Sequence, residues 1–246
     1  MIAAKIQAHG KVSLYSSTTP SERALDNLLL SKNKERKYKI NKDAIKTAGA
    51  VLAHKCKRVW VITLTTTCKE EKIKETNNAL NLYIKNLEQN YHLKGYVGVV
   101  EFQQNGNIHY HLLCRIDTYK LDIVKFNAAW CKALSNALHV NYYYANAVRV
   151  GGIAKSGRRY YYITSINHAV AYLTKYMSKG SGKHSTKCYF ISKTLRVKPL
   201  KIYGTEVYNM LANISINKTY IAEYVTIYYI EPREAIEIIE QFYCLT

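Results

Sequence analysis

Residues 95–116 read GYVGVVEFQQNGNIHYHLLCRI and form the centre of the predicted fold. Two runs rich in β-branched and aromatic residues flank Asn105-Gly106, a dipeptide typical of hairpin turns. The second run carries His109 and His111. Because residues i and i+2 of a strand point to the same face, the two imidazoles lie side by side. The stretch therefore predicts a β-hairpin with a candidate metal site on one face.

The length of the hairpin loop decides whether Glu101 can join the two histidines. With a two-residue loop, Glu101 would oppose Tyr110 and point to the other face. With the three-residue loop 104–106, a type I turn is followed by Gly in the left-handed conformation, and Glu101 opposes His109. Gly106 stands where that loop needs it. We predict the three-residue loop, with Glu101, His109 and His111 on one face.

Two imidazole nitrogens and one carboxylate leave room for water and phosphate oxygens around a metal ion. This donor set suits octahedral Mg²⁺ or Mn²⁺, of which Mn²⁺ tolerates imidazole better. The same set also admits Zn²⁺.

The rest of the chain alternates strand and helix patterns, which indicates an α+β fold. Apolar periodicity and turn signals predict a strand over 59–67, a helix over 70–89, a helix over 122–138, short strands over 140–165 and a helix over 167–179.

The last of these helices carries Tyr172, Lys175 and Tyr176 at positions i, i+3 and i+4, so the three project from one face. Tyrosine can act as a nucleophile, but its usual pKa near 10 demands a neighbouring cation or a metal-polarised phosphate. Lys175 could supply that charge.

The composition points to nucleic acid. The formal charge is +19, from 36 Lys and Arg against 17 Asp and Glu, and 23 tyrosines are mixed among the basic residues. An AT-rich coding sequence would raise Lys, but it would not lower Glu. Basic residues attract phosphates and tyrosine rings stack on unpaired bases.

Other function classes are disfavoured. There is no run of about 18 apolar residues and no apolar core of a signal peptide, so we expect a cytoplasmic protein without a membrane partner. The six cysteines form no C-x-x-C pair. Residues 180–185 read GSGKHS and do not match the phosphate-binding loop of nucleotide triphosphatases.

The order of three motifs resembles the HUH endonucleases, the rolling-circle replication initiators of small single-stranded DNA phages and plasmids. Residues 62–66 (ITLTT) resemble their first motif, His109-Tyr110-His111 the second, and Tyr172-x-x-Lys175-Tyr176 the tyrosine helix. The tyrosine spacing looks most like the two-tyrosine initiators of microvirus-type phages. Glu101 sits where related initiators often carry a third ligand. Tyr110 replaces the usual aliphatic residue, and we expect it on an outward-facing strand position.

The resemblance covers roughly residues 59–180 and implies a central antiparallel sheet of about five strands, with helices on one face and the tyrosine helix over the metal. It divides the chain into a basic N-terminal extension (1–55), a nuclease domain (56–200) and a C-terminal extension (201–246).

The resemblance also implies an activity: nicking of single-stranded origin DNA through a 5′-phosphotyrosine link, and rejoining without ATP. Glu101, His109 and His111 would hold Mg²⁺ or Mn²⁺, and Tyr172 or Tyr176 would attack. Lys175 would hold the phosphate or favour the phenolate. Host polymerase and helicase would be the protein partners.

The loop 151–159 is a candidate DNA contact through Lys155, Arg158 and Arg159; a solvated loop is the alternative. A relaxase or transposase of the same class, a binding protein that does not cleave, and a water-using metal-dependent hydrolase are the competing functions.

Overall fold

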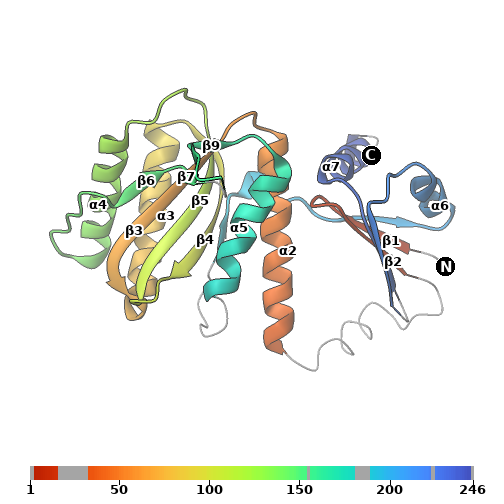
Figure 1. The fold of residues 1–246 in the computed structure, drawn as a ribbon, viewed down its shortest axis with the longest axis horizontal. Coiled ribbons are helices and arrows are strands. Elements are labelled where there is room, and N and C mark those ends of the chain that lie inside the picture. The colour runs from red at the N-terminus through yellow and green to blue at the C-terminus, as the bar shows by residue number, and fades with distance from the viewer. Residues whose placement is uncertain (1–2, 16–32, 154–155, 181–188, 223–224, 245–246) are drawn as a thin grey trace.

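The computed structural model describes residues 3–15, 33–153, 156–180, 189–222 and 225–244 (Figure 1). They form two antiparallel sheets, one on each side of the long helix α2 (Asn33–His54). The expected α+β class is confirmed. Within these residues, no helix is both long and apolar enough to span a bilayer.

The main sheet has six strands, five of them on one path in the order β10-β4-β5-β3-β6, and β9 pairs with the end of β3. All of its pairings are antiparallel. The strands are β3 (Val59–Lys69), β4 (Leu93–Phe102), β5 (Asn107–Ile116), β6 (Val148–Val150), β9 (Tyr162–Ile163) and β10 (Tyr189–Ile191). The predicted hairpin is β4–β5, at the middle of this sheet.

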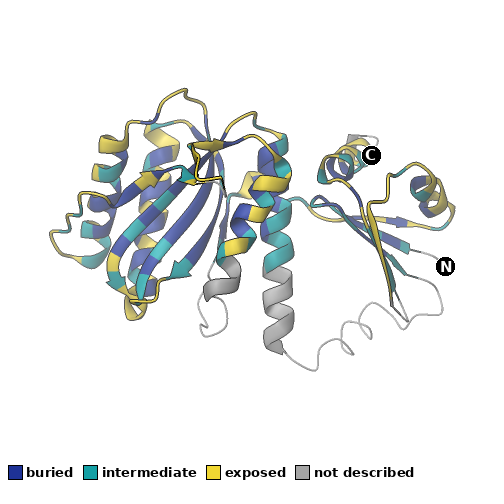
Figure 2. Cartoon of the chain, viewed as in Figure 1, coloured by how far each residue is buried: buried dark blue, intermediate teal, exposed yellow. Residues whose placement is uncertain are grey.

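Both faces of the main sheet are covered by helices, because its strands are apolar on alternate residues and on both sides. The helices α3 (Ile73–Asn90) and α4 (Ile123–Leu138) cover one face and bury Ile62. On the opposite face, α2 and α5 (Ile166–Gly180) bury Val61. The strands are accordingly the most continuously buried part of Figure 2. The sequence analysis expected helices on one face; α2 and α5 add a second layer.

Tyr110 corrects one sequence expectation. We expected an outward-facing position, and this was wrong: the side chain is fully buried against α3. Its hydroxyl lies 2.9 Å from both Thr76 Oγ1 and Asn77 Oδ1. A buried phenol needs such partners. Tyr110 therefore anchors the centre of the hairpin on the face opposite to the two histidines.

The two ends of the chain share the second sheet, whose order is β11-β1-β2-β13-β12. Its strands are β1 (Ala3–Gln7), β2 (Lys11–Tyr15), β11 (Leu200–Tyr203), β12 (Lys218–Ala222) and β13 (Val225–Tyr229), and its helices are α6 (Thr205–Ala212) and α7 (Pro232–Cys244). The segments treated above as N- and C-terminal extensions thus pair with each other. Three smaller elements are β7 (Gly152–Ile153), β8 (Arg159–Tyr160) and the 3₁₀ turns at Glu70–Lys72 and Lys193–Leu195.

His9 joins the second sheet to α2. Its side chain is only 4% exposed, and Nδ1 lies 3.0 Å from Thr47 Oγ1. Burial lowers the pKa of His9 to about 4, although the nearby carboxylate of Asp43 opposes the shift. The imidazole is therefore neutral at pH 7.

This buried histidine predicts acid sensitivity. Between pH 6.5 and 4 the unfolded chain binds a proton at His9 that the folded chain does not, so stability is full above pH 6.5 and falls as the pH drops toward 4, by about 3 kcal/mol. His109 has a similarly lowered pKa, so His9→Gln should remove about half of the combined loss. Urea unfolding at several pH values in EDTA measures this. His168→Gln, at an exposed position, should leave the slope unchanged; equal slopes in wild type and His9→Gln would contradict the prediction.

Candidate metal and tyrosine site

The hairpin loop has the predicted three-residue form. Gly106 has φ +81°, and its N–H donates to the Gln103 carbonyl at 2.8 Å. Lys69 Nζ donates to the Asn105 carbonyl at 2.6 Å and so ties the loop to β3. In the resulting register Glu101 opposes His109, which is the pairing expected from the sequence.

Glu101, His109 and His111 form a group that could hold a metal ion, with one ligand atom from each within 4.8 Å of the others. His111 Nε2 lies 2.7 Å from Glu101 Oε2, and both side chains are largely buried. The three side chains come from adjacent strands, as predicted.

The donor chemistry of this group fits a divalent cation. His109 Nε2 is buried, and it has no hydrogen-bond partner among the described residues. A buried nitrogen of this kind costs free energy unless a ligand meets it. Burial, together with the positive charge of a protonated His111, lowers the pKa of His109 to about 4. The ring is therefore neutral at pH 7, which is the form that binds metals.

Helix α5 places both predicted tyrosines against His111. The ring of Tyr176 stacks on the imidazole, with centroids 3.6 Å apart and planes at 14°. The hydroxyl of Tyr172 lies 3.4 Å from His111 Nδ1. Lys175 lies at the exposed rim, with Nζ 5.6 Å from the centre of the Tyr176 ring. The structure thus brings all six predicted catalytic and metal residues into one site.

The two tyrosines differ in their surroundings. Tyr172 is 8% exposed and packs in the core beneath α5, whereas Tyr176 is half-buried. Burial, and after it the nearby Tyr176, raises the pKa of Tyr172 above its usual value. Tyr172 therefore needs more help to lose its proton than a solvent-exposed tyrosine does.

Two further residues on this face of the sheet were missed as individual functional residues. Thr63, within the first motif, lies opposite His111, and its Oγ1 is 3.3 Å from Nδ1 of that ring. Arg149 on β6 pairs with Thr63 on the other side, is exposed, and its charge acts on His109. Alternation within the short strand Val-Arg-Val was the available signal, but which strand it joins is a long-range property.

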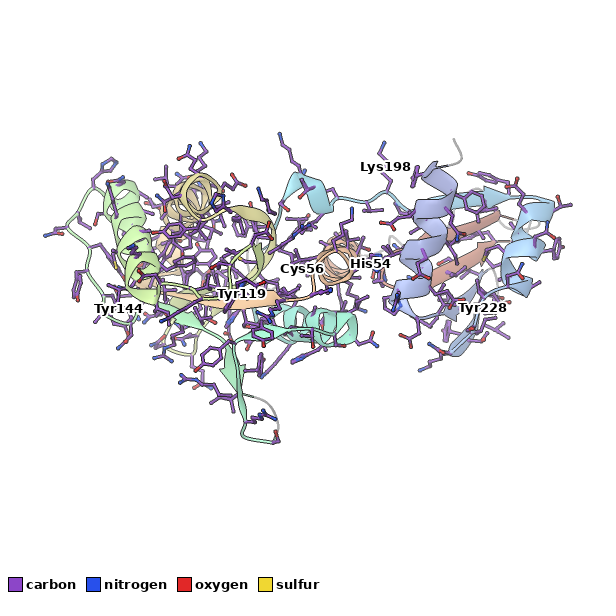
Figure 3. All side chains as sticks on the ribbon, turned by 90° about the horizontal axis from the view of Figure 1, so that it is seen from above. His54, Cys56, Tyr119, Tyr144, Lys198 and Tyr228 are labelled. Atoms are coloured by element: carbon purple, nitrogen blue, oxygen red, sulfur yellow. The ribbon has the colours of Figure 1, made fainter. Side chains whose placement is uncertain are left out.

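The predicted DNA contacts lie beside the tyrosine helix. Arg158 and Arg159 are exposed, and Arg159 lies over the ring of Tyr161 at 6.0 Å. The neighbouring Tyr160 packs edge-on against His168 of α5, with ring centroids 5.2 Å apart. In Figure 3 the β7–β8 hairpin projects away from the main sheet. Lys155 falls outside the described residues.

This geometry can be compared with known families. The model of the family described as replication-associated protein ORF2 / gene II protein matches residues 59–181, half of the chain. The chain belongs to this family. The match spans the main sheet from β3 onward, the metal-binding group and the tyrosine helix. No curated protein and no solved structure matches the chain.

Proposed function

We propose that this replication-associated protein nicks and rejoins single-stranded origin DNA through a covalent 5′-phosphotyrosine intermediate. One observation carries the proposal: two tyrosines on one helix contact a histidine of a group able to hold a metal ion. A binding protein has no use for this combination, whereas phosphoryl transfer needs a charge on the phosphate and a nucleophile beside it.

Each residue has a defined part in this reaction. The hydroxyl of one tyrosine loses its proton, its oxygen bonds to phosphorus, and the bond from phosphorus to the 3′ oxygen breaks. The released strand takes up a proton and ends in a 3′-OH. Glu101, His109 and His111 would hold Mg²⁺ or Mn²⁺, which when bound supplies positive charge to the scissile phosphate. Lys175 and Arg149 lie at the rim and add positive charge for the same oxygens.

The second tyrosine makes the cycle repeatable. Attack by a 3′-OH on the phosphotyrosine reverses the first step, restores the phosphodiester and frees the hydroxyl, so no nucleotide triphosphate is consumed. With Tyr172 and Tyr176 one helical turn apart, one can carry a strand while the other is free. This matches the pattern of two-tyrosine initiators of microvirus-type phages and supports rolling-circle replication, with host polymerase and helicase as partners.

The test is covalent capture from a single-stranded DNA library. The purified protein is incubated with 3′-tagged oligonucleotides of random sequence and Mn²⁺, denatured, and the DNA that stays attached is sequenced. We expect a shared sequence whose 5′ end is linked to protein, and no capture in EDTA. Cleavage without attached DNA would favour a water-using hydrolase. Absence of cleavage with Mg²⁺, Mn²⁺ and Zn²⁺ would leave a binding protein.

A further inference from the structure

The second sheet has one face that no helix covers. In Figure 3, α7 lies over β1 and β2 from one side. That inner face carries Ala4, Ile6, Val12 and Ile202, which are buried together with Val207 of α6 and Ile236 of α7. All helices of the described residues lie on this inner face or around the main sheet. The opposite side is termed the outer face here.

The register of the five strands identifies the outer-face residues. Alternate positions leave the inner face, so Tyr15 and Tyr203 share one row across the sheet. Tyr220 lies in the next row, and Tyr229 pairs with Lys218 in the third. With strands about 4.8 Å apart, these tyrosines span about 20 Å.

The chemistry of the outer face is aromatic and basic. Exposed fractions are 54% for Tyr203, 58% for Tyr220 and 38% for Tyr229, so three phenol rings stand in solvent on a sheet. Lys201 and Lys218 are exposed among them. No Asp or Glu occupies an outward-facing position in the described parts of these five strands. A solvated sheet face usually mixes both signs of charge, which this one does not.

We propose that the outer face is a second binding surface for single-stranded DNA, separate from the metal and tyrosine site. Flat aromatic rings on an open sheet offer stacking platforms for unpaired bases, and the lysines between them meet the phosphates. A duplex hides its base faces and offers only phosphates to such a surface. Choosing DNA rather than RNA rests on the proposed function. The surface holds the displaced or template strand while the main sheet performs the chemistry.

The test measures binding without cleavage, so it stands even if the nicking reaction is disproved. Fluorescence anisotropy of a labelled 20-mer of thymidine is recorded in EDTA with the full chain. The variant Tyr203→Ala/Tyr220→Ala/Tyr229→Ala should bind at least about tenfold more weakly, because each ring lost removes a stacking contact. The corresponding triple Phe variant keeps the rings and should bind within about threefold of wild type.

Matched controls come from the covered side of the sheet. Tyr208 on α6 and Tyr243 on α7 are 58% and 52% exposed, so Tyr208→Ala/Tyr243→Ala removes comparable rings elsewhere. This control should bind like wild type. Equal weakening in the control and the triple Ala variant, or a 20-base-pair duplex bound as tightly as the single strand, would overturn the proposal. Thermal unfolding of the triple Ala variant separates lost binding from lost folding, and the triple Phe variant decides if it unfolds.

Discussion

Replacing both Tyr172 and Tyr176 by Phe should abolish covalent capture of DNA, to below about one thousandth of the wild-type rate. Phe keeps the ring that stacks on His111 and removes only the hydroxyl that attacks phosphorus. The lost contact between Tyr172 and His111 is 3.4 Å long and should cost no more than about 1 kcal/mol of stability. Denaturing electrophoresis of the captured oligonucleotide, once its sequence is known, measures the effect.

The single variants should differ from each other. Tyr176 is half-buried, whereas Tyr172 is 8% exposed beneath it, so an incoming phosphate meets Tyr176 first. We expect Tyr176→Phe to lose most of the first cleavage and Tyr172→Phe to keep it but lose transfer to a second strand. Tyr143→Phe, at an 80% exposed position elsewhere, serves as control. An adduct that persists in the double variant would exclude both tyrosines as the nucleophile.

Loss of a metal ligand should be nearly as severe. His109→Ala and Glu101→Gln each remove one donor of the group, and we expect the rate of adduct formation to fall by about a thousandfold at fixed Mn²⁺. His109 is the cleaner site, because its buried Nε2 has no hydrogen-bond partner in the described part of the chain. His111→Ala would also remove the ring on which Tyr176 stacks.

The same variants give a readout that is independent of activity. A metal ion that binds only the folded protein stabilises it by about 2.7 kcal/mol at a concentration of 100 times Kd. Wild type should therefore show a rise in Tm with Mn²⁺ that His109→Ala lacks. The control Glu88→Gln, exposed on α3, should keep the rise. A Tm that responds to Mn²⁺ equally in wild type and His109→Ala would show that the metal binds elsewhere.

The site was predictable where its geometry is local. The turn chemistry around Gly106 sets the register of β4 and β5, and this register alone places Glu101 beside the histidines. The spacing of Tyr172 and Tyr176 needs only helical periodicity. Both signals lie within a few residues of the groups that they position.

The second sheet could not be predicted in this way. Its strands β1 and β11 pair Ala3 with Tyr203, so 200 residues separate the partners in sequence. No turn residue or periodicity marks such a pairing, because it depends on how the intervening chain folds. Arg149 belongs to the same class: its strand is short, and only the pairing with β3 brings it to the site. Tyr110 was misplaced because a strand buried on both faces shows no alternation.

The contact between α2 and α5 has a consequence for how this protein can diversify. Gly49 of α2 lies against α5, and a Cβ at this position would stand 3.1 Å from Leu173 Cδ1, one residue away from Tyr172. The family match begins at residue 59, so this contact comes from outside the matched segment. A larger side chain at position 49 would move the nucleophiles relative to their phosphate without altering any of the three motifs. Selection can thus tune the reaction through a helix that carries no catalytic group.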